Sequence, residues 1–127
     1  MVPPTEVVPR RRYPSPDGNP VRYYFDIPFA DNVKHITLDL LIEDLSDANA
    51  RVSLDLVQSL TRDIADDEWH AIESTPMFND KSSEGYSVAT TTESFGGFVR
   101  AVLTIQDSAT TNPMAAVVSA RASGKPF

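Results

Sequence analysis

The stretch "KHITLDLLIED", residues 34–44, decides the fold class, because its side chains alternate with a period of two. One face carries Ile36, Leu38, Leu40 and Ile42, and the other face is mostly polar. Such alternation is typical of a β-strand with one face in a hydrophobic core and the other in solvent. The stretch therefore predicts a sheet protein in which a second layer covers the apolar face.

The segment that follows repeats the pattern. "SDAN" (46–49) has the composition of a turn, and "RVSLDLVQ" (51–58) alternates again, with its valines and leucines on one face. Two alternating runs joined by a short turn are the usual signature of a hairpin. We therefore predict an antiparallel hairpin over residues 34–58.

Further strands are predicted on both sides of this pair. "VRYYFDIP" (21–28) is rich in aromatic residues and ends at a proline, which suits an edge strand. "FVRAVLTIQ" (98–106) has one wholly apolar face and a mixed one, which indicates a central strand. Shorter strands are expected at "WHAIES" (69–74) and "YSVATTTE" (86–93).

Two segments near the C-terminal end need separate arguments. "SFGG" (94–97) predicts a tight turn or bulge, because glycine adopts backbone angles that other residues resist. "MAAVVSARA" (114–122) is compatible with a helix through its alanines. Its adjacent valines, its short length and the preceding Pro113 favour a last strand instead.

Seven or so short strands joined by turns imply two sheets packed face to face. We predict an all-β protein, an antiparallel β-sandwich of jelly-roll or immunoglobulin-like type over residues 21–127, preceded by an extended arm at residues 1–20. A length of 127 residues fits one domain and is enough to bury a core without a covalent staple.

The composition excludes several classes of function. The chain has no cysteine, which removes disulfides, zinc–thiolate sites and thiol catalysis. No apolar run approaches the roughly 20 residues of a membrane span, and we see no signal peptide at the N-terminus. The lack of cysteine fits assembly in the cytoplasm of a host cell, and we expect no cofactor.

The charge is unevenly distributed. Residues 1–20 hold three arginines against two acidic residues, a balance of +1, and residues 21–127 hold eight basic and sixteen acidic residues, a balance of −8. An acidic body repels nucleic acid and anionic membranes, so we expect neither as a partner.

The N-terminal stretch "MVPPTEVVPRRRYPSPDGNP" (1–20) contains six prolines. Proline fixes φ and lacks an N–H, so the stretch is predicted to be extended. Laid across a neighbouring subunit, it would use Tyr13 for contact and Arg10, Arg11 and Arg12 to pair with carboxylates. The alternative is a disordered tail.

Aromatic residues mark two more candidate contacts. Tyr23 and Tyr24 lie in a strand with aromatics on both faces, next to the arm, and we interpret them as part of a protein interface. Trp69 has two interpretations: a core residue, or, if exposed, a platform on which a sugar ring stacks.

Other candidate residues carry less specific chemistry. The acidic cluster Asp63, Asp66, Asp67 and Glu68 has oxygen ligands for calcium, but its spacing does not match an EF-hand and it lacks that loop's glycine. A solvated acidic loop is the alternative. His35 and His70 belong to no recognisable motif. No catalytic or phosphate-binding motif is evident, so we expect a protein that is not an enzyme.

The order of these features resembles a known group of proteins. An acidic turn precedes a tryptophan, and an aromatic–x–Arg strand comes late, here at Asp66, Asp67, Trp69, Phe98 and Arg100. Over residues 34–121 this is similar to small β-sandwich head proteins of tailed bacteriophages and to galactose-binding-like jelly rolls. The chain departs from the pattern at residues 67–68, where Asp-Glu replaces the glycine common in that turn.

The resemblance implies a non-enzymatic structural protein of a virion, such as a bacteriophage capsid decoration or minor capsid protein. Its partners would be the major capsid protein or copies of itself. The alternative is a carbohydrate-binding or adhesion module.

Overall fold

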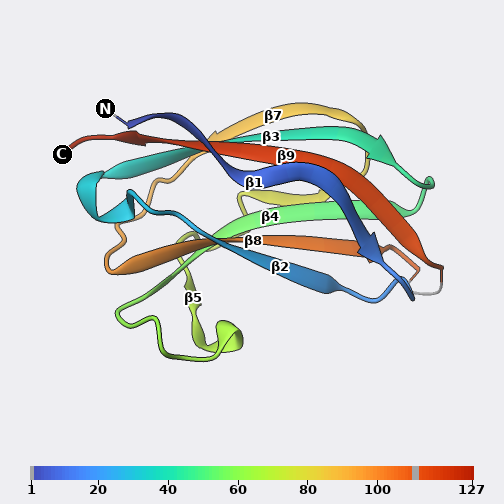
Figure 1. The fold of residues 1–127 in the computed structure, drawn as a ribbon, viewed down its shortest axis with the longest axis horizontal. Helices are drawn as coiled ribbons and strands as arrows, with labels where there is room; N and C mark the ends of the chain where they lie inside the picture. The colour runs from blue at the N-terminus through green and yellow to red at the C-terminus, as the bar shows by residue number, and fades with distance from the viewer. Residues whose placement is uncertain (1, 110–111) are drawn as a thin grey trace.

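The computed structural model describes residues 2–109 and 112–127 and has two antiparallel sheets packed face to face (Figure 1). The four-stranded sheet has the order β1 (Val2–Ser15), β9 (Met114–Lys125), β3 (His35–Leu45), β7 (Gly85–Thr90). The five-stranded sheet contains β2 (Val21–Asp26), β8 (Phe98–Asp107), β4 (Ala50–Ser59) and β5 (His70–Ala71), in that order, and β6 (Phe78–Lys81), which pairs with β4. Single turns of 3₁₀ helix lie at η1 (Ala30–Asn32) and η2 (Asp66–Glu68). The predicted all-β antiparallel sandwich is confirmed, and of the two predicted types it is consistent with the jelly roll.

The core lies between the two sheets, as the alternation predicted. The apolar face of β3, from Ile36 to Ile42, is at most 3% exposed. Across the core, Leu54 and Leu56 of β4 and Leu103 of β8 are fully buried. Mostly small side chains line the buried face of β9: Ala116, Val118, Ala120 and Ala122. The last strand therefore contributes little volume, and the large side chains come from the strands around it.

The predicted hairpin over residues 34–58 is wrong. Both strands form, but β3 belongs to the four-stranded sheet and β4 to the five-stranded sheet. The turn between them carries the chain from one layer to the other. Alternation shows that each strand buries one face, and this holds equally for strands that pair and for strands that face each other across a core.

The remaining strand predictions mostly hold. β8 lies between β2 and β4, and β9 lies between β1 and β3, so both are central strands, while β2 is an edge. The strand expected over residues 69–74 is shorter, because only His70–Ala71 pair with β4. At residues 94–97 the chain forms a loop with a bend at Gly97, and the glycine argument holds there, since Gly97 has a φ of +74° and a Cβ would clash with the Ser59 carbonyl oxygen.

The N-terminal segment differs most from its prediction. It is extended, but it is not a separate arm: β1 pairs antiparallel with β9 of the same chain, from Val2 opposite Gly124 to Ser15 opposite Met114. Figure 1 shows β1 lying along β9 at the side of the sandwich. Prolines are tolerated there because an edge strand needs only some of its N–H groups for pairing.

Aromatic packing explains why β1 stays on its own domain. Tyr13 is 1% exposed, and its ring meets the rings of Tyr23 and Phe25 edge-on, at centroid distances of 5.0 and 6.1 Å. The Tyr13 hydroxyl donates to the Pro9 carbonyl, and the Tyr23 hydroxyl donates to the Pro14 carbonyl, each at 2.6 Å. Tyr13 thus closes the side of the sandwich between one sheet and the other.

Candidate functional site

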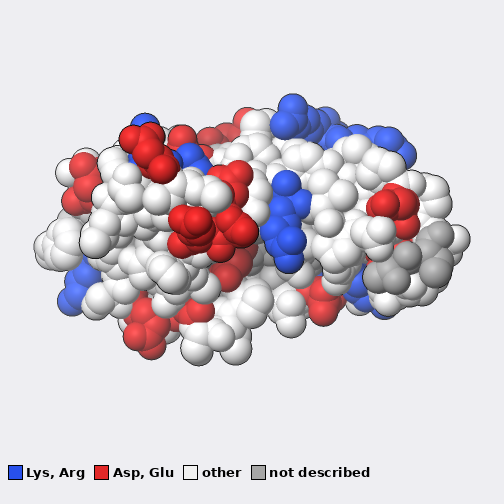
Figure 2. Space-filling view, turned by 90° about the horizontal axis from the view of Figure 1, so that it is seen from below, with Lys and Arg blue, Asp and Glu red and all other residues white. Residues whose placement is uncertain are grey.

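The outer face of the five-stranded sheet carries the best-defined candidate site. The pairing register places three cross-strand rows there: Asp26, Arg100 and Val57; Tyr24, Val102 and Asp55; and Arg22, Thr104 and Ser53. Figure 2 views the molecule from this side and shows acidic side chains gathered over one half, with a band of basic side chains near the centre. The sheet therefore presents aromatic, basic and acidic groups on one surface.

Arg100 organises one end of this surface. Its Nε lies 2.9 Å from Asp26 Oδ1, and its Nη1 lies 2.7 Å from Asp66 Oδ1 in η2. Its guanidinium stands over the Trp69 ring, 4.3 Å from the centroid. The three contacts join β2, β8 and the segment after β4, so the acidic segment is held against the sheet rather than left as a free loop.

Next to Arg100 the surface is hollowed into a groove of about 340 Å³. We call it the outer groove, and the residues that line it are Arg22, Tyr24, Val57, Asp66, Asp67, Trp69 and Val102. The half-buried ring of Tyr24 and the apolar Val57 and Val102 supply contact area. The carboxylates accept hydrogen bonds and the Arg22 guanidinium donates them, which suits a polar ligand with one flat apolar face.

Burial affects one carboxylate beside this groove. Asp55 lies on the same face, next to Val102, and desolvation raises its pKa above the ordinary value. Its Oδ1 accepts a long hydrogen bond from the Met77 N–H, at 3.4 Å. The segment before β6 therefore covers Asp55, and the open part of the face ends there.

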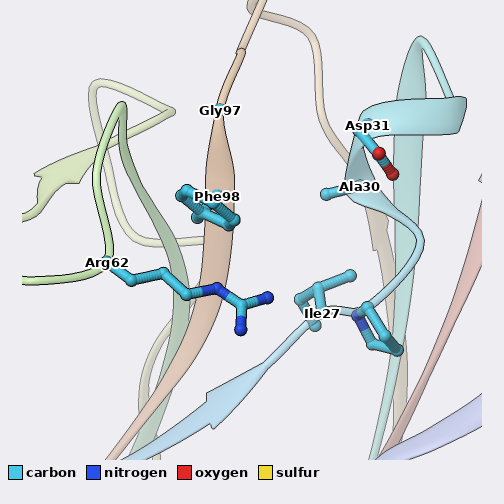
Figure 3. A pocket seen from close by; sticks show the side chains of 7 residues that line it. Ile27, Ala30, Asp31, Arg62, Gly97 and Phe98 are labelled. Atoms are coloured by element: carbon cyan, nitrogen blue, oxygen red, sulfur yellow. The ribbon is translucent and has the colours of Figure 1, made fainter.

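A second hollow lies at one end of the sandwich. Ile27, Pro28, Ala30, Asp31, Arg62, Gly97 and Phe98 line it, with a volume of about 230 Å³ (Figure 3). Arg62 extends beneath Phe98, with its guanidinium carbon 4.5 Å from the ring centroid. The hollow has one cation and one anion but a mostly apolar wall, and it offers fewer hydrogen-bonding groups than the outer groove.

The acidic cluster does not assemble into a metal site. Among residues 2–109 and 112–127, no group of three or more His, Asp or Glu side chains is placed to hold an ion. Asp66 pairs with Arg100, and Asp67 lines the outer groove. The candidate calcium ligands Asp63, Asp66, Asp67 and Glu68 are thus not brought together.

The histidines and the tryptophan are found in separate places. His35 begins β3 and His70 lies in β5, on different sheets. Trp69 is 7% exposed and has Arg100 over its ring, so it offers no free face for stacking. It is buried, as one interpretation expected, but on the outer side of the five-stranded sheet. Tyr24 is the more accessible ring.

The residues predicted to bind a partner divide into two groups. Tyr13 is a core residue and is not available to a partner, and Tyr23 packs against it and is partly buried, so its role stays a prediction. Arg10 pairs with Glu43 of β3 at 2.6 Å, and Arg11 lies over the Tyr13 ring at 5.1 Å. Arg10, Arg11 and Arg12 nevertheless remain exposed on β1, and Tyr24 lines the outer groove. A role for these four in partner binding stays a prediction.

Sequence reasoning missed Arg22, Asp26 and Val102. The alternation in β2 does contain part of the signal, because Arg22, Tyr24 and Asp26 share one face. Which strand lies beside that face, and which loop folds over it, depends on pairings between distant segments. Those pairings have no local signature.

Comparisons with known proteins extend the fold assignment. No family model matches, and no curated protein matches by sequence. Among solved structures, a chain in the structure of infectious bursal disease virus, Gx strain, is similar with a TM-score of 0.57 and 9% identity. The match covers 96% of this chain, which spans only 30% of the viral one.

Two further structures are more distant. PliG of Aeromonas hydrophila, a periplasmic inhibitor of g-type lysozyme, has a TM-score of 0.46 and 11% identity, over 93% of this chain and 86% of its own. A family 29 carbohydrate-binding module of Piromyces equi has a TM-score of 0.37 and 12% identity, over 98% and 93%. The predicted resemblance to a protein of a virus is thus confirmed as a weak likeness of fold, through the viral chain alone. No helix in the described part of the chain has the length and apolar character to cross a membrane.

Proposed function

We propose that the protein is a non-enzymatic structural subunit of a virus particle, of the kind that decorates the capsid of a tailed bacteriophage or forms a minor part of it. The observation that carries the proposal is the fold, because nearly the whole chain matches part of a chain in a virus structure. Its partners would be the major capsid protein or copies of itself.

The surface supports this proposal in a second way. Arg11 and Arg12 are exposed on β1, and neither belongs to an ion pair within residues 2–109 and 112–127. The acidic segment around η2 lies on the outer face of the other sheet, where it pairs with Arg100. Since β1 is a strand of the domain, the contact with a neighbour would be made by this row of arginines on a fixed surface, not by a mobile arm.

The native particle tests the proposal. The virus that encodes the chain is purified, and its proteins are quantified by mass spectrometry alongside cryo-electron microscopy. We expect the chain in a fixed ratio to the major capsid protein, with density matching the sandwich on the particle. A purified particle that lacks the chain, while infected cells contain it, would contradict the proposal.

The outer groove favours a second candidate function, the binding of a carbohydrate. A sugar ring has an apolar face and hydroxyl groups at its rim, and Tyr24 with Asp66, Asp67 and Arg22 supplies the matching ring, acceptors and donor. Titration calorimetry with a panel of oligosaccharides tests it. For any sugar that binds, Tyr24→Ala should weaken binding at least about tenfold. Tyr86→Ala, on the other sheet, is the matched control and should leave binding unchanged.

A further inference from the structure

One edge of the four-stranded sheet is open. β7 pairs with β3 alone, and the hydrogen bond from the Thr91 N–H to the Ile36 carbonyl, 2.9 Å, sets the phase of that pairing. In an antiparallel ladder the hydrogen-bonded pairs alternate with non-bonded ones. Ser87 and Ala89 therefore direct their N–H and C=O groups to β3, and Tyr86, Val88 and Thr90 direct theirs outward.

The side chains at these three outward positions are uncharged, and two of them expose apolar surface. Tyr86 is 57% exposed and Val88 is 54% exposed, both on the outer face of the sheet. The strand has six residues, without a proline or a charged side chain. An exposed edge of this kind is a template for pairing with another strand.

The other edges are protected by devices that β7 lacks. β1 carries Pro3, Pro4, Pro9 and Pro14, which have no N–H to offer. β5 has only two residues, and β6, which pairs with the same strand, has four, two of them charged. In β2 the Ile27 N–H donates to the Val99 carbonyl of β8, and hydrogen-bonded pairs alternate with non-bonded ones from there. The backbone N–H and C=O groups of Arg22, Tyr24 and Asp26 therefore point away from β8, toward the open edge. Charged side chains at such positions discourage edge pairing.

We propose that β7 pairs with β7 of a second copy of this chain, antiparallel and around a twofold axis at Val88. Val88 would then face its own counterpart, and Tyr86 would face Thr90 of the other copy. These three pairs use every outward donor and acceptor of the strand, in about six hydrogen bonds. Aromatic and β-branched side chains facing each other also stabilise a sheet. The two four-stranded sheets become one continuous sheet.

The net charge opposes association of two copies, but it does not oppose pairing at this strand in particular. Each chain has a net charge of −7, so two copies repel at long range. The uncharged β7 brings no like charges face to face at the contact. Added salt screens the repulsion without weakening the hydrogen bonds, so dimers should form more tightly as salt is raised. The inference goes beyond the proposed function, because it depends on the edge and not on any virus particle.

Sedimentation velocity of the purified full chain, over a series of concentrations and salt, measures the pairing. We expect a monomer–dimer equilibrium. Val88→Pro removes an N–H that β3 does not use, and should weaken the dimer at least about tenfold. Val88→Thr keeps the N–H and the β-branched shape, and is the control that should still dimerise. A wild type that stays monomeric at all concentrations would overturn the inference, as would a Val88→Pro variant that dimerises as tightly.

Amide hydrogen exchange tests the same contact without any substitution. Ser87 and Ala89 should be protected at all concentrations because they bond to β3. Tyr86, Val88 and Thr90 should gain protection only as concentration rises. Equal, concentration-independent exchange at these three amides in a sample that does dimerise would place the interface elsewhere and refute the proposed pairing.

Discussion

β1 and β7 are the two edge strands of one sheet, but β1 packs its side chains into the core and β7 leaves its large side chains exposed. β1 has prolines along its length and still buries Tyr13 and Val8 almost completely, so it closes one side of the sandwich. β7 has the sequence of an ordinary strand, but it leaves Tyr86 and Val88 half exposed and one side of its backbone unpaired. Side-chain burial, and not strand propensity, decides which edge is closed.

The difference also changes the expected role of the N-terminal segment. The sequence predicts an arm that leaves its domain to reach a neighbour, but in the structure the segment is a strand of its own domain, and only its exposed arginines are left for a partner. The inconspicuous strand "GYSVAT" (85–90) offers the free edge. Three predictions test this comparison, beginning with the largest expected effect.

Deleting residues 1–15 should abolish cooperative folding. The deletion removes Val7, Val8 and Tyr13 from the core and exposes the paired edge of β9. A domain of this size is stabilised by about 5–15 kcal/mol, and losing a buried edge strand costs a large part of that. Thermal melting followed by circular dichroism measures it. Deleting residues 126–127, where Phe127 is 88% exposed, is the control and should leave the melt unchanged. A cooperative melt for the shorter chain would show that β1 is dispensable.

Exchanging the two tyrosines for alanine compares the edges directly. Tyr13→Ala should destabilise the fold by about 3–5 kcal/mol, because it empties a packed aromatic site. Tyr86→Ala removes an exposed ring and should change stability by less than about 0.5 kcal/mol. Urea unfolding, with protein dilute enough to be monomeric, gives both values. Tyr13→Phe, which loses only the hydrogen bond to Pro9, should cost about 0.5–1.5 kcal/mol. Similar losses for Tyr13→Ala and Tyr86→Ala would contradict the comparison.

Much of this fold was predictable because local patterns carry it. The alternation in residues 34–44 and 98–106 places each apolar face correctly, and Gly97 marks its bend through its backbone angle. The hairpin error shows the limit of such patterns. Ser46 and its neighbours indicate that the chain turns, but not whether the next strand joins the same sheet.

The N-terminal error has a different cause. Six prolines dominate the segment, and proline does predict an extended backbone. What holds the segment in place is the meeting of Tyr13 with Tyr23 and Phe25, from a strand of the other sheet. The outer groove depends likewise on Arg100 reaching Asp26 and Asp66 across three segments. Contacts of this kind follow from tertiary packing and leave no spacing that a single sequence reveals.

The smallest expected effect concerns the ion pair between Arg10 of β1 and Glu43 of β3. Arg10 spans β9 to reach Glu43 on β3, and this hydrogen-bonded pair lowers the pKa of Glu43 below its ordinary value of 4.5. Since the folded state favours the ionised carboxylate, the pair stabilises the fold at every pH above that ordinary pKa. The contribution is lost as the pH falls through the lowered pKa. Carboxyl-carbon NMR of Glu43 should show a depressed midpoint that Arg10→Gln restores.

Because the pair is exposed, salt should screen it, and Arg10→Gln should leave the β1 amides protected from hydrogen exchange. Glu84→Gln, which removes an exposed carboxylate beside β7, is the matched control and should leave the Glu43 midpoint unchanged. If Arg10→Gln instead released β1 from β9, charge rather than the burial of Tyr13 would hold the closed edge. The difference between the closed edge at β1 and the open edge at β7 would then come from the ion pair of Arg10 and not from side-chain packing.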